Sequence, residues 1–217
     1  MPSRTLTQEP GPHPAGYGNR VVRLPIPESD GALVARLRSE PERARAALYD
    51  RYSADVLRVL CRVLGPDSEL DDLLHEVFIV AMASIDKLRN ENALRHWVTG
   101  IAIRKARRLI RWRKLRRLVK FVAPQDLPER EAITAPAEVT DALRQTYRIL
   151  ESLPTEDRIA FTLRQIDGME LAAIAELTGV SLATVKRRVA RAQKSFVASA
   201  RQDEVLAEWL ERGTMLQ

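Results

Sequence analysis

The sequence has few of the residues that build disulfide, metal and redox sites. Its 217 residues include one cysteine, Cys61, and three histidines, which are scattered along the chain. A disulfide within the chain is therefore impossible, and no cysteine–histidine cluster has the spacing of a zinc site. Cys61 falls within an apolar helical pattern, which favours a buried structural thiol over a reactive one. We expect neither a metal nor another cofactor.

Further absences narrow the class of protein. The sequence has no phosphate-binding glycine loop, no carboxylate cluster with a plausible metal geometry, and no pairing of serine or cysteine with histidine. An enzyme, such as a nuclease or a DNA-modifying protein, is therefore the least favoured interpretation, and we expect no catalytic residues. The chain also has no apolar run long enough to span a bilayer and no signal peptide at its start, so we expect a cytoplasmic protein.

What the sequence does contain is typical of a helical protein with a polyanionic partner. Aromatic residues make up 5% of the chain and there are only nine glycines, whereas Ala, Leu, Arg and Glu are abundant. This composition favours an all-α fold. The formal net charge of +6 favours a partner that carries negative charge, although it says nothing about the fold.

Proline-rich, aperiodic segments divide the chain into two predicted helical domains. Residues 1–29 hold six prolines and no helical period, which predicts a disordered leader. Four helices are expected within residues 30–118. Residues 119–136 again bring prolines and mixed charge, which is typical of a flexible linker. Helices resume in a second domain over residues 137–200, and a helical tail is expected over residues 201–217.

Caps and breakers predict the helices of the first domain. Asp30 is expected to cap a short first helix. A second helix is expected from Pro41 to about Leu64, where a glycine–proline pair ends it. A third helix, capped near Asp67, is expected to reach about Leu88, and the fourth follows after a short break.

Residues 170–196 are predicted to form a helix-turn-helix. Gly179 should end the first helix, because glycine accepts the left-handed conformation found at helix C-termini. Ser181 should then cap the second helix. Apolar positions at helical spacing give that helix one buried face, which consists of Val185, Val189, Ala192 and Phe196.

The rest of this second helix has the polar and basic side chains that a recognition helix needs in the major groove. The residues that we predict to bind DNA here are Ser181, Thr184, Lys186, Arg187, Arg188, Arg191 and Lys194. The alternative is a helical hairpin with a solvated basic face. Turn chemistry, small-residue placement and charge together favour DNA binding.

Charge is segregated along the first domain. Acidic residues predominate over 67–91, whereas residues 92–125 contain no acid and many arginines and lysines. Trp97 and Trp112 lie within this basic helix, which suits phosphate contact and base stacking. The residues that we predict to bind nucleic acid are Arg104, Lys105, Arg108, Arg111 and Trp112. The alternative is a solvated helix face with Trp112 packed into its own domain.

Three stretches resemble the extracytoplasmic-function group of sigma-70-type RNA polymerase sigma factors. Residues 72–78, DLLHEVF, are similar to the D-L-x-x-E-V-F pattern of region 2. Trp97 followed by Ile101-Ala102 is similar to the W-L-x-x-I-A stretch that precedes the promoter-melting surface. Residues 153–186 resemble region 4, whose pattern is L-P-x-x-x-R and then I-A-x-x-x-G-x-S-x-x-T-V-K.

Two positions of the first domain depart from the family pattern. Arg104 stands where the family usually has asparagine, and Arg108 replaces a common acidic residue. Both changes add positive charge to the surface that is expected to contact DNA, and this strengthens nonspecific attraction of the phosphate backbone.

The resemblance implies a fold and a function. The first domain would be region 2, which docks on core RNA polymerase and binds and melts the −10 element. The second would be region 4, which places the helix beginning at Leu182 in the major groove of the −35 element. The implied partners are promoter DNA and core RNA polymerase, and the family resemblance also allows an anti-sigma factor. The residues implied to bind polymerase are Asp72, Leu73, Glu76 and Val77.

Simpler interpretations remain beside this one. The second domain alone would also suit a helix-turn-helix regulator that binds DNA and never joins polymerase. Asp72 and Glu76, without the resemblance, are simply carboxylates on a helix surface. The matching first domain and its change from acidic to basic charge favour the sigma factor.

Overall fold

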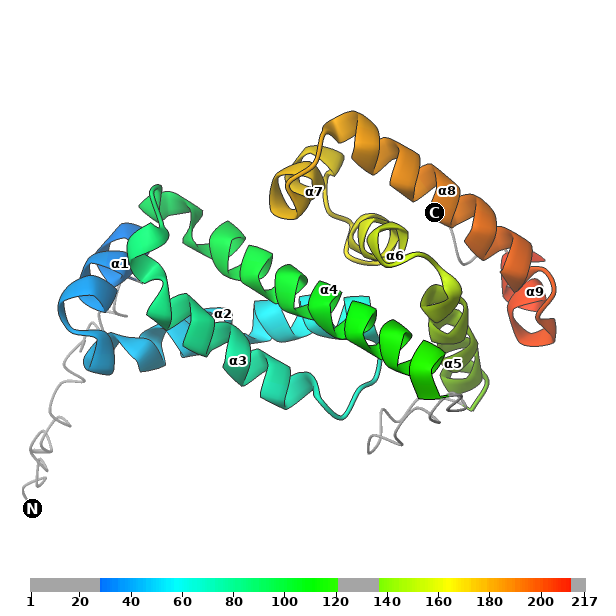
Figure 1. Ribbon diagram of the computed structural model, residues 1–217, viewed down its shortest axis with the longest axis horizontal. Helices are drawn as coiled ribbons and strands as arrows, with labels where there is room; N and C mark the ends of the chain where they lie inside the picture. Colours follow the sequence, from blue (N-terminus) through cyan, green and yellow to red (C-terminus); the bar gives the residue numbers. More distant parts are fainter. Residues whose placement is uncertain (1–27, 121–136, 212–217) are drawn as a thin grey trace, which may run out of the picture.

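The computed structural model describes residues 28–120 and 137–211, and every regular element within these two ranges is helical (Figure 1). The first domain contains α1 (Asp30–Ser39), α2 (Pro41–Leu64), α3 (Leu70–Ala83), the short turns η1 (Ile85–Lys87) and η2 (Glu91–Ala93), and α4 (Leu94–Lys120). The second contains α5 (Ala137–Ser152), α6 (Thr155–Phe161), the π-helical turn η3 (Thr162–Ile166), α7 (Leu171–Thr178), α8 (Leu182–Ala200) and α9 (Glu204–Glu211). The predicted all-α fold with two helical domains is confirmed. The predicted leader and linker lie outside the described residues, except for a few residues at their edges.

The first helix is capped by Ser29, not by Asp30 as the sequence predicted. The Ser29 hydroxyl accepts a hydrogen bond from the Ala32 N–H at 3.2 Å. Asp30 instead accepts hydrogen bonds from Arg51 and Tyr52 of α2. The Asp30 carboxylate, which the local sequence predicted to cap the helix, therefore makes tertiary hydrogen bonds to α2 instead.

The third helix is shorter than predicted, because it ends at Ala83 rather than near Leu88. The Ser84 hydroxyl donates to the Val80 carbonyl at 2.6 Å, and the chain then tightens into η1. The predicted cap near Asp67 is also wrong. Asp67 accepts a hydrogen bond from the Glu69 N–H at 2.9 Å in the turn before the helix, and its carboxylate is paired with Arg113 of α4.

The core of the first domain forms where each of its four helices buries one face. The buried face of α2 is a stripe at helical spacing that includes Leu48, Tyr52, Val56 and Leu60. Fully burying a leucine stabilises a fold by about 1.5–3 kcal/mol, so this stripe is a major source of stability. Cys61, which was expected to be a buried structural thiol, is partly buried and packs against this core.

The two domains are in contact. In Figure 1, α6 and α7 lie between α4 of the first domain and α8. Ile159, Ala160 and Leu163 of the second domain belong to the same continuous apolar cluster as the first domain's core. A smaller cluster, which includes Tyr147 and Phe196, joins α5, α6, α8 and α9. The sequence predicted two domains joined by a flexible linker. The structure adds a direct contact, because the apolar face of α6 and η3 packs against the first domain.

Candidate nucleic-acid interface

Residues 171–200 form the predicted helix-turn-helix. Gly179 ends α7 in the left-handed conformation, with φ of 70°. The Ser181 hydroxyl accepts a hydrogen bond from the Thr184 N–H at 3.2 Å and so caps α8. The predicted apolar face of α8 is buried, and it consists of Val185, Val189, Ala192 and Phe196. Propensity, cap and packing therefore agree on where this helix begins and which side it buries.

Four of the predicted basic residues of α8 are exposed, and these are Lys186, Arg187, Arg191 and Lys194. Lys186, Arg187 and Lys194 point away from the core, and none of them forms an ion pair with another described residue. Ser181 and Thr184 lie at the N-terminal end of the same helix, where a recognition helix approaches base edges. These side chains are free to contact a duplex.

The other two arginines of α8 are held by acidic residues at the start of α6. Arg188 Nη1 lies 3.3 Å from Glu156 Oε2. Arg191 makes two hydrogen bonds to Asp157, from Nε to Oδ2 at 2.6 Å and from Nη2 to Oδ1 at 2.7 Å. The basic residues of α8 that were predicted to bind DNA thus fall into two groups. Arg188 and Arg191 are paired with carboxylates of α6, whereas the others form no ion pair with a described residue.

The basic helix α4 presents a groove on its outer side. The groove has a volume of about 450 Å³ and is lined by Arg104, Arg107, Arg108, Arg111, Trp112 and Leu115. The Trp112 side chain is 49% exposed, and the Arg116 guanidinium carbon lies 5.0 Å from its ring centre. Trp112 is therefore not packed into its own domain, and the alternative interpretation of this residue is wrong. An exposed indole among arginines suits an unpaired base and its phosphate.

Positive charges crowd one another along this groove. Burial, and then the neighbouring guanidinium of Arg107, lower the pKa of Arg104. Two nitrogens of Arg107, Nε and Nη2, are buried without a hydrogen-bond partner. The same Nε lies 3.2 Å from Glu156 Oε1, which is an ion pair by distance but lacks hydrogen-bond geometry. An anion in the groove would relieve this crowding.

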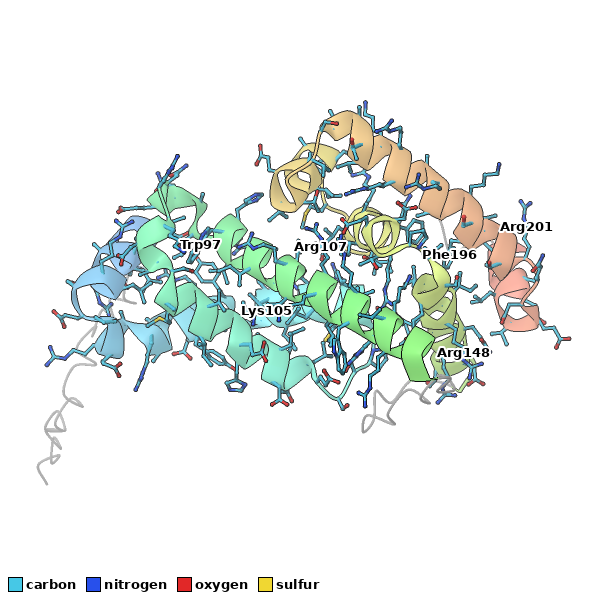
Figure 2. The ribbon with its side chains drawn as sticks, in the orientation of Figure 1. Trp97, Lys105, Arg107, Arg148, Phe196 and Arg201 are labelled. Carbon is cyan, nitrogen blue, oxygen red and sulfur yellow. The ribbon has the colours of Figure 1, made fainter. Side chains whose placement is uncertain are left out.

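Not every predicted residue of α4 belongs to the groove. Lys105 points to α3, where its Nζ lies 2.7 Å from Glu76 Oε2, whereas Arg107 points toward α6 (Figure 2). A residue predicted to bind DNA is thus paired with one predicted to bind polymerase. Arg111 lines the groove and also donates to Glu156 at 2.7 Å.

The predicted polymerase-binding residues are split between the surface and the core. Asp72 and Glu76 are exposed on α3, but Leu73 and Val77 are buried in the first domain's core. Leu73 and Val77 therefore pack the domain rather than present a surface, which corrects their assignment as contacts. Ile79 shares the exposed face of Asp72 and Glu76 and is 66% exposed. Its helical spacing from Asp72 and Glu76 was the signal that the sequence interpretation missed.

Two further kinds of site concern the described ranges, residues 28–120 and 137–211. There, no group of three or more His, Cys, Asp or Glu side chains could hold a metal ion. Within those same ranges, no helix has the length and apolar character needed to cross a bilayer.

The fold and its two basic helices define a two-domain helical DNA-binding protein. The family model described as Sigma-70 region 2 matches residues 48–118, and the model described as Sigma-70, region 4 matches residues 143–195. The ECF RNA polymerase sigma-E factor of Escherichia coli (strain K12) is 28% identical over 177 residues, which cover 77% of this chain and 92% of that protein. The factor of the same name from Haemophilus influenzae is 27% identical over 180 residues, which cover 76% and 92%. The chain belongs to the sigma-70 family, in its extracytoplasmic-function group.

Two solved structures share the fold. CnrH in complex with the cytosolic domain of CnrY matches with a TM-score of 0.59 and 24% identity, covering 82% of this chain and 100% of that one. The sigma factor RpoE in complex with the anti-sigma factor NepR from Bartonella quintana matches with a TM-score of 0.52 and 19% identity, covering 66% and 88%. At these identities the likeness extends to the fold alone.

Proposed function

We propose that this sigma-family protein binds core RNA polymerase, recognises and melts the −10 element through its first domain, and binds the −35 element through α8. The observation that carries the proposal is the presence of two different DNA-suited surfaces in one chain. One is a capped recognition helix, and the other is a groove of arginines around an exposed tryptophan. A duplex reader and a single-strand binder are both needed where promoter DNA is opened.

The α8 surface supports binding to duplex DNA. Lys186, Arg187 and Lys194 supply cations for the phosphate backbone, and Ser181 and Thr184 lie at the end of the helix that enters the groove. Arg188 and Arg191 serve first to hold α8 against α6, and they reach DNA only after release from their carboxylates.

The α4 groove supports binding to opened DNA. Arg104, Arg108 and Arg111 attract the backbone, and Trp112 offers a ring on which an unpaired base stacks. The added charge of Arg104 and Arg108 strengthens binding that does not depend on sequence. The polymerase performs the chemistry, and the chain itself contributes no catalytic group.

The exposed face of α3 supports docking on polymerase. Asp72 and Glu76 provide negative charge, and Ile79 adds the apolar contact that a protein interface needs at its centre. We assign Ile79 to this surface in place of the buried Leu73 and Val77. With polymerase and promoter DNA as its partners, the protein acts in the cytoplasm.

Co-purification with core RNA polymerase tests the proposal. The chain should elute with core polymerase on size exclusion, and Ile79→Asp should weaken that association because it places a charge at the centre of the contact. Val139→Asp, at an exposed apolar residue of α5, is the matched control and should leave association unchanged. Specific binding to duplex DNA without any association with polymerase would instead support a helix-turn-helix regulator.

A further inference from the structure

A small cavity lined mainly by cations lies where α2, α4, α5 and α6 meet. Its volume is about 20 Å³. The residues that line it come from both domains, and they are Leu64, Ile110, Arg113, Lys114, Arg117, Glu151 and Arg158. Four of these side chains are cationic and one is anionic, so the lining carries more positive than negative charge.

Two of the four cations are paired with carboxylates. Arg113 donates to both oxygens of Asp67, with Nη2 at 3.0 Å from Oδ1, and the same Nη2 lies 3.1 Å from Glu69 Oε1. Arg117 Nη2 lies 3.0 Å from Glu151 Oε2. Because Glu151 is the carboxylate of the lining, its pair with Arg117 uses the negative charge that the cavity itself supplies.

Arg158 is the most deeply buried cation of the lining and lacks such a pair. Its side chain is only 4% exposed, and this burial lowers its pKa to about 10. It donates from Nε to the Val63 carbonyl at 3.0 Å and from Nη2 to the Leu64 carbonyl at 3.1 Å. Among the described residues, no carboxylate forms an ion pair with it. The carbonyls satisfy hydrogen bonds but do not balance the charge, and an uncompensated buried charge is costly.

Lys114 brings a second uncompensated charge to the same cavity. Its Nζ donates to the Leu153 carbonyl, which leaves further N–H donors on the ammonium group. Burial, and then the charges of Arg158 and Arg117, lower the pKa of Lys114, whereas Glu151 acts in the opposite direction. Within residues 28–120 and 137–211, Lys114 also forms no ion pair. The two unpaired cations therefore repel one another across the cavity.

The size of the cavity restricts what could bind between these cations. A space of about 10–15 Å³ holds one water molecule, so a cavity of about 20 Å³ holds one particle of similar size and excludes a nucleotide. Water would accept hydrogen bonds without balancing the charge. A small anion does both, because it accepts several N–H donors and lowers the repulsion between them. The Arg117 and Glu151 side chains are 41% and 28% exposed, which gives such an ion a route from solvent.

We propose that this cavity binds one small inorganic anion of the size of chloride, held by Lys114 and Arg158 with Arg117 at its entrance. Arg158 supplies the buried charge, and Lys114 supplies the donors that its contact with Leu153 leaves over. Glu151 competes with the anion for Arg117 and so limits the affinity. The site uses only contacts within the chain, so it does not depend on the proposed function.

Thermal unfolding of the full chain in two salts provides the first test. Sodium chloride and sodium gluconate are compared at equal ionic strength, because gluconate is too large for the cavity. A ligand that binds only the folded chain raises the midpoint of unfolding, so the midpoint should be higher in chloride. The line width of the chloride NMR signal measures binding directly, and it should increase when the protein is added and saturate as chloride is raised.

Two variants should change chloride affinity in opposite directions. Lys114→Gln should weaken binding about tenfold or more, because it removes a charged donor. Glu151→Gln should strengthen binding, because it removes the competing carboxylate and releases Arg117. Lys87→Gln is the matched control for Lys114→Gln, since Lys87 is exposed on η1, and it should leave chloride binding unchanged. Loss of a purely structural contact would not raise the affinity for an ion.

The outcomes separate an anion site from general salt effects. Saturable chloride binding that Lys114→Gln weakens and Glu151→Gln strengthens supports the site. Equal responses of the parent, Glu151→Gln and folded Lys114→Gln would mean a bound water or an adventitious ion only and would overturn it. If Lys114→Gln does not fold, an unchanged chloride affinity in Glu151→Gln overturns the proposal by itself. Failure of the parent to associate with core polymerase would overturn the proposed function and leave the chloride result standing.

Discussion

Asp157 receives two hydrogen bonds from Arg191, from Nε to Oδ2 at 2.6 Å and from Nη2 to Oδ1 at 2.7 Å. Asp157 lies in the first turn of α6 and is 1% exposed, whereas Arg191 projects from the exposed side of α8. Two parallel hydrogen bonds fix both the distance and the orientation of the two groups. The pair therefore sets how the recognition helix sits on its own domain.

Asp157→Asn should lower the urea midpoint of unfolding. The change removes the charge and one acceptor from a buried site and leaves the Arg191 guanidinium poorly paired. Arg187→Ala is the control, because Arg187 is exposed and makes no ion pair within the described ranges. Equal midpoints for Asp157→Asn and the parent would contradict a positioning role for this pair.

Stability should fall at acid pH through Asp67. Burial raises the pKa of Asp67, but hydrogen bonds from Arg113 and the Glu69 N–H outweigh it, and the pKa lies below the ordinary value of 3.8. Because the folded-state pKa is depressed, the stabilisation is complete above pH 3.8 and is lost as pH falls through the folded-state value. Asp67→Asn should therefore cost about 1–3 kcal/mol at pH 7 and less at pH 3.

Urea unfolding from pH 7 to pH 3 measures this effect. The free energy of unfolding of the parent should fall toward that of Asp67→Asn as the pH decreases. Asp72→Asn is a suitable control, because Asp72 is exposed on α3. A constant difference between the parent and Asp67→Asn across the range would rule out the linkage.

Trp112 should contribute more to strand opening than to initial duplex binding. Stacking of a base on an aromatic ring is worth about 1–3 kcal/mol, so Trp112→Ala should reduce permanganate reactivity at the −10 region of a promoter complex. Trp112→Phe keeps an aromatic ring and should retain most of the opening. A folded Trp112→Ala protein that opens the promoter as well as the parent does would refute the stacking role.

The free cations of α8 should control the salt dependence of binding to a −35 duplex. Each phosphate contact releases counterions, so alanine at Lys186, Arg187 or Lys194 should lower the slope of log affinity against log salt by about one. A residue that reads a base would instead cost about 1–3 kcal/mol at one position of the site. Unchanged affinity and slope in all three variants would remove these residues from the interface.

Periodicity and turn chemistry were enough to predict most of the helices. Gly179 ends α7 and Ser181 caps α8 as predicted, because the conformation of Gly179 and the hydrogen bond of Ser181 are local. The cap at Asp30 was wrong, because tertiary contacts with Arg51 and Tyr52 override local preference. Local rules predict an element well only where nothing distant competes for its side chains.

The contact between the domains could not be predicted from the sequence. Helical spacing indicates that Ile159 and Leu163 are buried, but it does not indicate which helix covers them. The pairing of Glu156 with arginines of α4 and α8 likewise joins residues far apart in the chain. Leu73 and Val77 were placed on the polymerase surface by the family resemblance, although the core buries them.

Transcription in vitro with core polymerase and a promoter library tests the central claim most directly. Core polymerase alone should give no specific transcripts, and adding the chain should produce transcripts from a subset of promoters that share −10 and −35 elements. Ile79→Asp should reduce those transcripts without abolishing binding to duplex DNA. Specific DNA binding by the chain, with no promoter-dependent transcripts from any member of the library, would contradict a sigma-factor function.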